Sequence, residues 1–153
     1  MENSRGNQIV DFSSEGELEK LKELFNLQFS QLEIDNALGL AIAYSHISVA
    51  EYLLSLGADF SYHNFDGVYY AAHNGELEGL KFSIFHGVDI NINEGMLLNV
   101  SIYTSINSKN IEMTKWLIDN GADVKKLTQQ SFGLIKSNGN DELKNLIKKP
   151  QGA

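Results

Sequence analysis

The chain has 153 residues, of which 42% are apolar, and no window approaches the 18 consecutive apolar residues of a membrane-spanning helix. It contains no cysteine, which excludes disulfides, thiolate metal sites and a thiol nucleophile and fits a reducing, cytoplasmic location. The formal charge is −8, and the stretch 23–80 holds eight carboxylates but no lysine or arginine, so we expect it to repel nucleic acid and anionic membranes and to attract a basic partner.

The first predicted element, near residues 5–34, is a polar version of a unit that recurs along the chain. Each unit has a helix-like run, a polar hinge and a second apolar run, and the middle units end in Gly-x-Asp. In the first unit the hinge opens the tetrapeptide Gly-Glu-Leu-Glu at 16–19, which returns at 75–78. The amphipathic run after each copy predicts a helix.

The second unit, near residues 35–65, has its hinge at 44–46 and ends in Gly-Ala-Asp at 57–59. Its first run carries Ala41 and Ala43, whereas its second run carries larger apolar residues. A narrow first helix lets the neighbouring unit press against it, so we expect these alanines to be buried.

The remaining units keep the same order. The hinges recur at intervals of 29 to 34 residues along the whole chain. The last unit ends without Gly-x-Asp, and the residues after it, 150–153, are expected to form a flexible tail. The unit ranges and hinges are 66–98 with 74–76, 99–127 with 108–110, and 128–149 with 138–140.

A period near 33 residues with helix, hinge, helix and Gly-x-Asp resembles the ankyrin repeat. The resemblance is carried mainly by the stretches 37–59, 66–89 and 101–123, and the flanking copies are weaker and more polar. It implies an all-α solenoid of about five helix-turn-helix repeats with polar terminal caps. It also implies a single domain over residues 1–149 that is a monomer when free.

The resemblance gives structural roles to the glycines and aspartates of the frame. A glycine just past each second helix is expected at positive φ. The hinge residue His46 is expected to bond to neighbouring backbone. The predicted structural residues are Gly57, Asp59, Gly75, Gly87, Asp89, Gly121 and Asp123.

The sequence departs from the family at the start of each inner helix, where the usual Thr-Pro is missing and the only proline is Pro150. Without it, we expect other residues to cap these helices, namely Asp35, Asp66 and either Asn99 or Ser101. The links between units also vary in length. The β-hairpin fingers that join ankyrin repeats are therefore expected to be irregular.

No catalytic or cofactor motif occurs in the chain: there is no phosphate-binding glycine loop, no GxSxG and no HExxH. His63 and His73 could lie close together, but a zinc site needs three or four ligands. The largest basic cluster is too small for a nucleic-acid interface. We therefore predict no cofactor, no metal site, no nucleic-acid or membrane binding and no catalysis.

The linker at 59–67 is unusually aromatic, although linkers are normally polar. Packing beneath the finger is the alternative to partner binding for Phe60 and Tyr62, and both interpretations stay open for Phe65. In ankyrin proteins, the fingers and the ends of the inner helices line the concave face that binds partners. The predicted partner-binding residues are Tyr44, Tyr62, His63, Phe65, Asp66, His73, Asn74, Asn107 and Ser108.

These features predict a non-catalytic module that binds a basic protein partner through its concave face. One concrete form is an inhibitor, such as an immunity protein that neutralises a cationic toxin. The alternative is an effector or scaffold that recruits a host or cellular protein. An enzyme would need a pocket built from scattered residues such as His63, Asp66 and His73.

Overall fold

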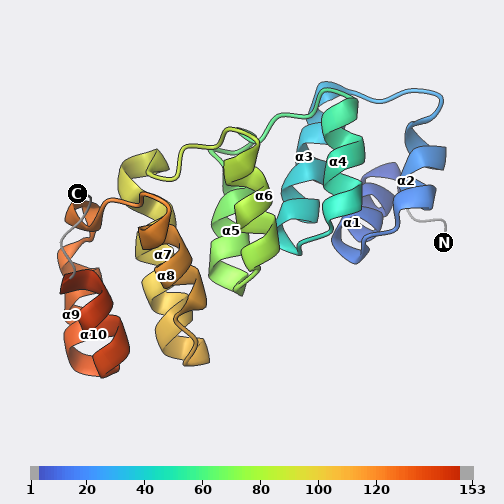
Figure 1. Cartoon of the computed structure of the whole chain (residues 1–153). Helices are drawn as coiled ribbons and strands as arrows, with labels where there is room; N and C mark the ends of the chain where they lie inside the picture. The colour runs from blue at the N-terminus through green and yellow to red at the C-terminus, as the bar shows by residue number, and fades with distance from the viewer. Residues whose placement is uncertain (1–3, 149–153) are drawn as a thin grey trace. The chain divides into compact units, whose positions relative to one another are not determined.

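The computed structural model describes residues 4–148, and this part of the chain is helical throughout (Figure 1). It contains ten α-helices and one short 3-10 helix, and no strand occurs in the described range. Turns therefore stand where the resemblance implied β-hairpin fingers. No helix within residues 4–148 combines the length and the apolar character needed to cross a membrane.

The helices group into two compact units that divide after Gly87, and each unit contains several of the repeats described in the sequence. The predicted tail 150–153 lies outside the described residues. The first unit holds three helix pairs: α1 (Arg5–Glu15) with α2 (Leu18–Phe25), α3 (Gln31–Ala43) with α4 (Ile47–Ser55), and α5 (Asp66–Asn74) with α6 (Leu77–Phe85). The second unit holds two: α7 (Ile92–Ser108) with α8 (Glu112–Asp119), and, after the 3-10 helix η1 (Val124–Lys126), α9 (Gln129–Asn138) with α10 (Asp141–Lys148).

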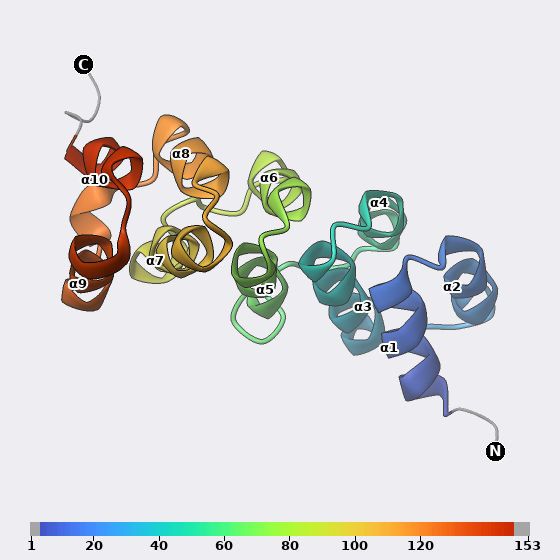
Figure 2. The ribbon, with the colours of Figure 1, turned by 90° about the horizontal axis from the view of Figure 1, so that it is seen from below.

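In the first unit the helices form two layers (Figure 2). One layer contains α1, α3 and α5, and α3 packs against both of the others. The second layer contains α2, α4 and α6, with α4 against both of the others. We call α1, α3 and α5 the inner helices and their exposed side the inner-helix face.

Each hinge of the first unit holds one residue in the left-handed region: Gly16 (φ 74°), Ser45 (φ 57°) and Gly75 (φ 76°). The chain reverses there, so consecutive helices lie antiparallel. The imidazole Nε2 of His46 lies 2.7 Å from the carbonyl oxygen of Ser14 in the preceding pair. This contact with neighbouring backbone is the structural role expected for that histidine.

The Gly-x-Asp endings place their glycines at positive φ, as the sequence predicts: 96° at Gly57, 103° at Gly87 and 107° at Gly121. A β carbon at any of the three would meet nothing within 4 Å, so backbone conformation and not space selects glycine. Each following aspartate accepts a hydrogen bond from the backbone N–H two residues on, which shapes the loop. These bonds are Ser61 to Asp59 (2.8 Å), Asn91 to Asp89 (2.9 Å) and Lys125 to Asp123 (2.9 Å).

The narrow residues predicted on the inner helices are buried, and larger apolar side chains accompany them in the core of the first unit. Small side chains let neighbouring helices approach closely. Burial of each large apolar side chain stabilises the fold by about 1.5–3 kcal/mol. The buried alanines are Ala41, Ala43, Ala71 and Ala72, and the fully buried leucines include Leu21, Leu38, Leu53 and Leu80.

The predicted caps of the inner helices are wrong. Asp35 lies inside α3, which begins behind the N-cap Ser30. There Ser30 Oγ accepts from the Glu33 N–H (3.1 Å) and the Glu33 carboxylate accepts from the Ser30 N–H (3.0 Å), forming a capping box. Asp66 is the first residue of α5, and the N-cap Phe65 makes no side-chain capping bond.

In the second unit, α7 opens with a left-handed turn at residues 93–95, where φ lies between 50° and 81°. Its regular turns follow Gly95, so the other two predicted caps, Asn99 and Ser101, lie inside the helix. Asn99 instead binds the segment after η1. Its Nδ2 donates to the Lys126 carbonyl (3.0 Å) and its Oδ1 accepts from the Thr128 N–H (2.9 Å).

Three hydroxyl groups bind one another in the interior of the second unit. Ser105 Oγ and Thr114 Oγ1 lie 2.7 Å apart, and Thr114 Oγ1 lies 2.9 Å from Ser101 Oγ. Ser101 Oγ donates to the Leu98 carbonyl (2.7 Å). All three side chains are buried. The cluster thus joins α7 to α8 with every hydroxyl group partnered.

The loop that ends the second helix pair is held by two side chains of α3. Gln31 Nε2 donates to the Gly57 carbonyl (2.8 Å), and Asp35 Oδ1 accepts from the Asp59 N–H (2.7 Å). Gln31 Nε2 also donates to Asp35 Oδ1 (2.8 Å), so the two side chains support each other. Asp35 therefore binds a loop and does not cap a helix.

In the second unit a single residue makes the corresponding pair of bonds. Asn91 Nδ2 donates to the Gly121 carbonyl (3.1 Å), and Asn91 Oδ1 accepts from the Asp123 N–H (2.8 Å). The single amide of Asn91 thus makes both bonds to this loop, whereas in the first unit the amide of Gln31 and the carboxylate of Asp35 make one bond each to the corresponding loop.

Candidate binding site on the first unit

A left-handed turn at residues 61–65 leads into α5. Just before it, the carboxylate of Asp59 accepts from the Ser61 N–H, and this bond lowers the pKa of Asp59. Residues 63–65 then adopt positive φ between 47° and 67° without a glycine among them. Each non-glycine residue in this region costs about 1–3 kcal/mol, so the surrounding packing holds the turn in place. The turn brings its aromatic side chains beside the start of α5.

Next to this turn, α3 and α5 approach each other at two glycines. A β carbon on Gly67 would overlap the backbone of Gly39, so packing requires glycine at 67. A β carbon on Gly39 would lie 3.7 Å from Gly67 Cα, an ordinary van der Waals distance. Glycine is therefore not required at 39, where the later pairs carry Tyr69 and Tyr103. Its missing side chain leaves a hollow between the two helices.

The hollow is a pocket of about 160 Å³ on the inner-helix face. Both glycines contribute to it, together with side chains from α3, the left-handed turn and α5. A second pocket of about 160 Å³, against α1 and the start of α3, shares two of these side chains, Asn36 and Tyr62. The lining side chains that carry chemistry in the first pocket are Asn36, Leu40, Tyr62, His63, Asp66 and Tyr70.

Aromatic rings form much of the pocket wall. The rings of Tyr62 and His63 stack with centroids 4.2 Å apart and an interplanar angle of 7°. Tyr70, on α5, is 46% exposed. Its ring meets that of Tyr69 edge-on at 5.1 Å and lies 6.3 Å from that of His73. These rings offer apolar faces and polar edges to whatever enters the pocket.

The polar groups of the pocket are not engaged with the rest of the described chain. Within residues 4–148, no hydrogen bond or ion pair is made by the carboxylate of Asp66, the amide of Asn36 or the hydroxyl groups of Tyr62 and Tyr70. Asp66 is exposed in the first turn of α5, where the helix macrodipole favours a negative charge. The pocket therefore presents one unpaired carboxylate and several hydrogen-bonding groups to solvent.

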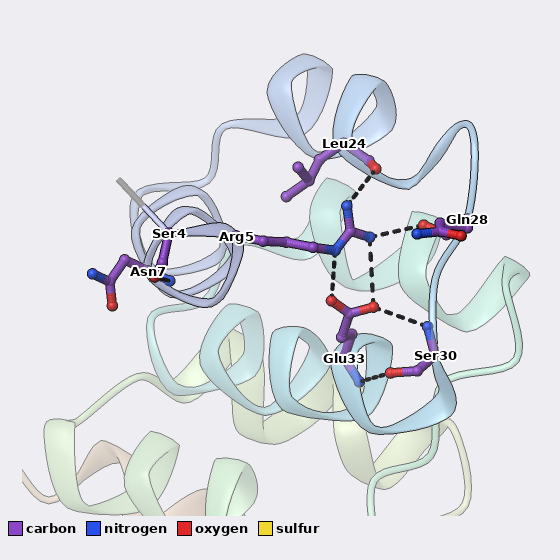
Figure 3. A network of polar contacts seen from close by, with 7 residues as sticks. All are labelled: Ser4, Arg5, Asn7, Leu24, Gln28, Ser30 and Glu33. Carbon is purple, nitrogen blue, oxygen red and sulfur yellow. Dashed lines mark hydrogen bonds and ion pairs between the residues drawn. The ribbon is translucent and has the colours of Figure 1, made fainter. Parts of the chain in front are cut away.

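The second pocket also has a carboxylate in its wall, that of Glu33, but this carboxylate forms an ion pair with Arg5. Arg5 Nε lies 2.7 Å from Glu33 Oε2, and the same guanidinium donates to the carbonyls of Gln28 (2.8 Å) and Leu24 (3.2 Å) (Figure 3). The hydrogen bond from Arg5 is the main cause that lowers the pKa of Glu33. The network binds α1 to α3, to the end of α2 and to the loop between α2 and α3, and it neutralises Glu33.

The charge around both pockets is negative. Residues 1–87 contain thirteen Asp and Glu against four Lys and Arg, a formal charge of −9. No lysine or arginine of the described chain lines either pocket. An aromatic wall with one free carboxylate in such a field suits a cation or a hydrogen-bond donor better than an anion.

Three of the predicted partner-binding residues, Tyr62, His63 and Asp66, meet at the first pocket. The other four of the first unit, Tyr44, Phe65, His73 and Asn74, lie outside it. Tyr44 is 47% exposed at the C-terminal end of α3, and Phe65 is half-buried at the N-cap of α5. Only three of the predicted partner-binding residues therefore lie together at one pocket.

The remaining predicted residues lie at helix ends. Asn74 Nδ2 donates to the Ala43 carbonyl (3.2 Å), which ties the end of α5 to α3, and His73 beside it is exposed. Asn107 and Ser108 are exposed at the end of α7 in the second unit, where Ser108 Oγ donates to the Thr104 carbonyl (2.7 Å). These contacts give Asn74 and Ser108 local structural roles.

Six residues of the pocket are absent from the predicted binding residues: Asn36, Gly39, Leu40, Ala43, Gly67 and Tyr70. A signal existed for Tyr70, because it follows Asp66 by four residues and so shares its helix face. A weaker sequence signal existed for Gly39, because the later helix pairs carry the large side chains of Tyr69 and Tyr103 at the corresponding position.

The described residues contain no group of three or more His, Asp or Glu side chains placed to hold a metal ion. No model of a known protein family matches the sequence, and no curated protein matches it. The chemistry of the site is that of its lining: aromatic faces, one free carboxylate and unengaged hydrogen-bonding groups.

Proposed function

We propose that the chain is an ankyrin-type repeat protein that binds a basic protein partner through the inner-helix face of its first unit. The observation that carries this is the group of half-buried and exposed aromatic side chains, Tyr62, His63 and Tyr70, beside an unpaired carboxylate, in a unit with a formal charge of −9. Tyrosines and other aromatic residues make effective anchors in interfaces, and complementary charge speeds association.

The ankyrin assignment is supported by features that recur from pair to pair. In the first four pairs, antiparallel helices are joined by left-handed hinges 29 to 34 residues apart, at Gly16, Ser45, Gly75 and Lys109. The Gly-x-Asp endings have one shared conformation, with glycine at positive φ followed by an aspartate turn. Buried alanines allow the inner helices to stack.

Inhibition is the form that we propose for this binding. A basic partner that acts on an anionic substrate needs its cationic surface, and an acidic protein bound there occupies it. An immunity protein that neutralises a cationic toxin works in this way. Because the interaction depends on complementary charge, it should weaken as ionic strength rises and the Debye length falls below about 8 Å.

The proposal is tested by capture of partners from the source cells with the full chain as bait. We expect basic proteins to be retained, and fewer of them at higher salt. The variant with Tyr62→Ala and Tyr70→Ala should lose the partner. Phe85→Ala serves as the control, because Phe85 is 72% exposed on α6 in the other layer.

Two outcomes would contradict the proposal. If the retained proteins are acidic, or if binding strengthens with salt, the electrostatic part is wrong. If Phe85→Ala loses the partner while the double tyrosine variant keeps it, the outer layer and not the inner-helix face is the binding surface.

A further inference from the structure

We propose that the pocket between α3 and α5 receives a single arginine side chain of the protein partner. This rests on the proposed function and specifies which group of the partner the inner-helix face recognises. The pocket holds about 160 Å³, which is below the roughly 300–1,000 Å³ of sites that enclose whole small molecules. Its size therefore suits one side chain better than a free ligand.

The aromatic wall favours a delocalised cation. Tyr62, stacked on His63, and the exposed Tyr70 line the same pocket. A guanidinium stacks on aromatic faces and is attracted by the ring quadrupole, and it is more weakly hydrated than an ammonium group. It therefore loses less hydration on entering a partly apolar pocket, to which Leu40 also contributes.

The unengaged polar groups match the donors of a guanidinium. Arginine presents five N–H donors in a planar fork and no acceptor. The pocket offers acceptors in the Asp66 carboxylate, the Asn36 side-chain oxygen and the tyrosine hydroxyl groups, none of which has another partner within residues 4–148. A lysine ammonium, with three donors on a compact charge, would use fewer of them.

The pocket exists because residue 39 is glycine. This residue lies inside α3, and a β carbon there would meet only ordinary van der Waals neighbours. A β carbon at this position would lie 3.7 Å from Gly67 Cα, so a side chain can begin here, at the edge of the pocket, without a clash at its first atom. Residue 39 therefore allows the pocket to be closed while the fold is kept, which separates binding from folding.

The experiment measures binding of Nα-acetyl-arginine methylamide to the full chain by two-dimensional NMR. We expect saturable shifts confined to amides around the pocket, such as those of Asn36, Gly39 and Gly67. The lysine analogue should bind more weakly, and the neutral citrulline analogue should bind at least about tenfold more weakly, because it keeps the shape but loses the charge. Equal binding of citrulline, tighter binding of lysine, or shifts elsewhere would overturn the proposal.

Variants test the geometry. Gly39→Leu should abolish the shifts and keep or raise the melting temperature, because leucine also has the higher helix propensity. Asp66→Asn should weaken binding about fivefold, and Tyr70→Ala about threefold. The matched control is Tyr103→Ala, since Tyr103 is also 46% exposed but belongs to α7. If Gly39→Leu folds and still binds the arginine analogue at the same residues, the pocket is not the site.

Repeating the capture experiment with Gly39→Leu separates this inference from the proposed function. Loss of the partner from this folded variant supports the pocket as the point of recognition. Retention of the partner by Gly39→Leu overturns the arginine pocket but leaves the inner-helix face as the binding surface. If no basic partner is captured by the unmodified chain, the proposed function fails, whatever the arginine analogue does.

Discussion

The two units hold the same kind of loop with different chemistry. In the first unit, Gln31 and the carboxylate of Asp35 together bind the loop at 57–59. In the second, the neutral amide of Asn91 alone binds the loop at 121–123.

The contacts between helices follow the same division. An ion pair between Arg5 and Glu33 joins α1 to α3, whereas hydroxyl groups, including those of Ser105 and Thr114, join α7 to α8. In these two contacts the first unit uses several residues, among them ionised side chains, whereas the second unit uses neutral side chains.

The largest expected effect on stability comes from removing the side chain of Asn91, which alone holds the loop at 121–123. Asn91→Ala removes two hydrogen bonds at once and should destabilise the second unit by about 2–3 kcal/mol. Gln31→Ala removes its bonds while Asp35 keeps the other half of the loop contact, so about 1 kcal/mol is expected in the first unit. Equal losses would show that the two loops are held equally.

Two probes separate the units in this measurement. Trp116 is the only tryptophan of the chain and lies in α8, so its fluorescence during urea unfolding reports on the second unit. Amide hydrogen exchange in α3 reports on the first.

A second test addresses the hydroxyl cluster. Thr114→Val keeps the side-chain shape but leaves the buried Ser105 hydroxyl without this partner, which should cost about 1–2 kcal/mol. The control is Thr104→Val, because the Thr104 hydroxyl bonds to the carbonyl of its own helix at Val100. Since no ionisable group takes part, the loss should be the same at neutral and mildly acidic pH. A loss that changes with pH would contradict a neutral cluster.

The third test uses acid to weaken the first unit. The Arg5 guanidinium lowers the pKa of Glu33 below its ordinary 4.5, so the pair stabilises the fold above that pH and is lost as pH falls through the lowered pKa. Both side chains are about one third exposed, so solvent screening limits the effect to about 1 kcal/mol or less.

Urea unfolding followed by circular dichroism between about pH 3 and 6 should show this dependence and should show less of it in Glu33→Gln. An unchanged pH dependence in Glu33→Gln would mean that another carboxylate is responsible.

The smallest effect concerns the left-handed hinge residues Ser45 and Lys109, both with φ of 57°. Lys109→Gly removes an unfavourable conformation and should stabilise the second unit by about 0.5–1 kcal/mol. Ser45→Gly should give no such gain, because Ser45 Oγ accepts from the Gly79 N–H at 2.9 Å and this bond is lost. Urea unfolding of the two variants checks the difference, and a gain in both would mean that the serine bond contributes little.

Much of the helical frame was predictable because it depends on local signals. Hinges with glycine or polar residues, and glycine past the second helix, determine where helices end, and these predictions agree with α4, α6 and α8. The starts of the inner helices were mispredicted. Ser30 and Glu33 form the Ser-x-x-Glu pattern of a capping box, a two-residue signal that satisfies two backbone N–H groups, whereas Asp35 lies within the helix.

The candidate site was only partly predictable. The aromatic linker pointed to Tyr62, His63 and Asp66, which do line the pocket. The left-handed turn that positions them has only a weak sequence signal: residues 63–65 are His-Asn-Phe, of which histidine and asparagine tolerate positive φ better than most residues, but none is glycine. The hollow itself depends on how closely α3 approaches α5, a tertiary property that no local pattern encodes.

Gly39 is also a suitable position for attaching a chemical label to the chain. The chain has no cysteine, so Gly39→Cys would introduce its sole thiol, at a helical position with room for a β carbon. A fluorophore or a cleavable crosslinker attached there would sit at the pocket and nowhere else on the chain. Because such a group would fill the hollow itself, a crosslinker there would capture a partner protein at the rim of the pocket, and mass spectrometry would then identify the partner residues that it reaches.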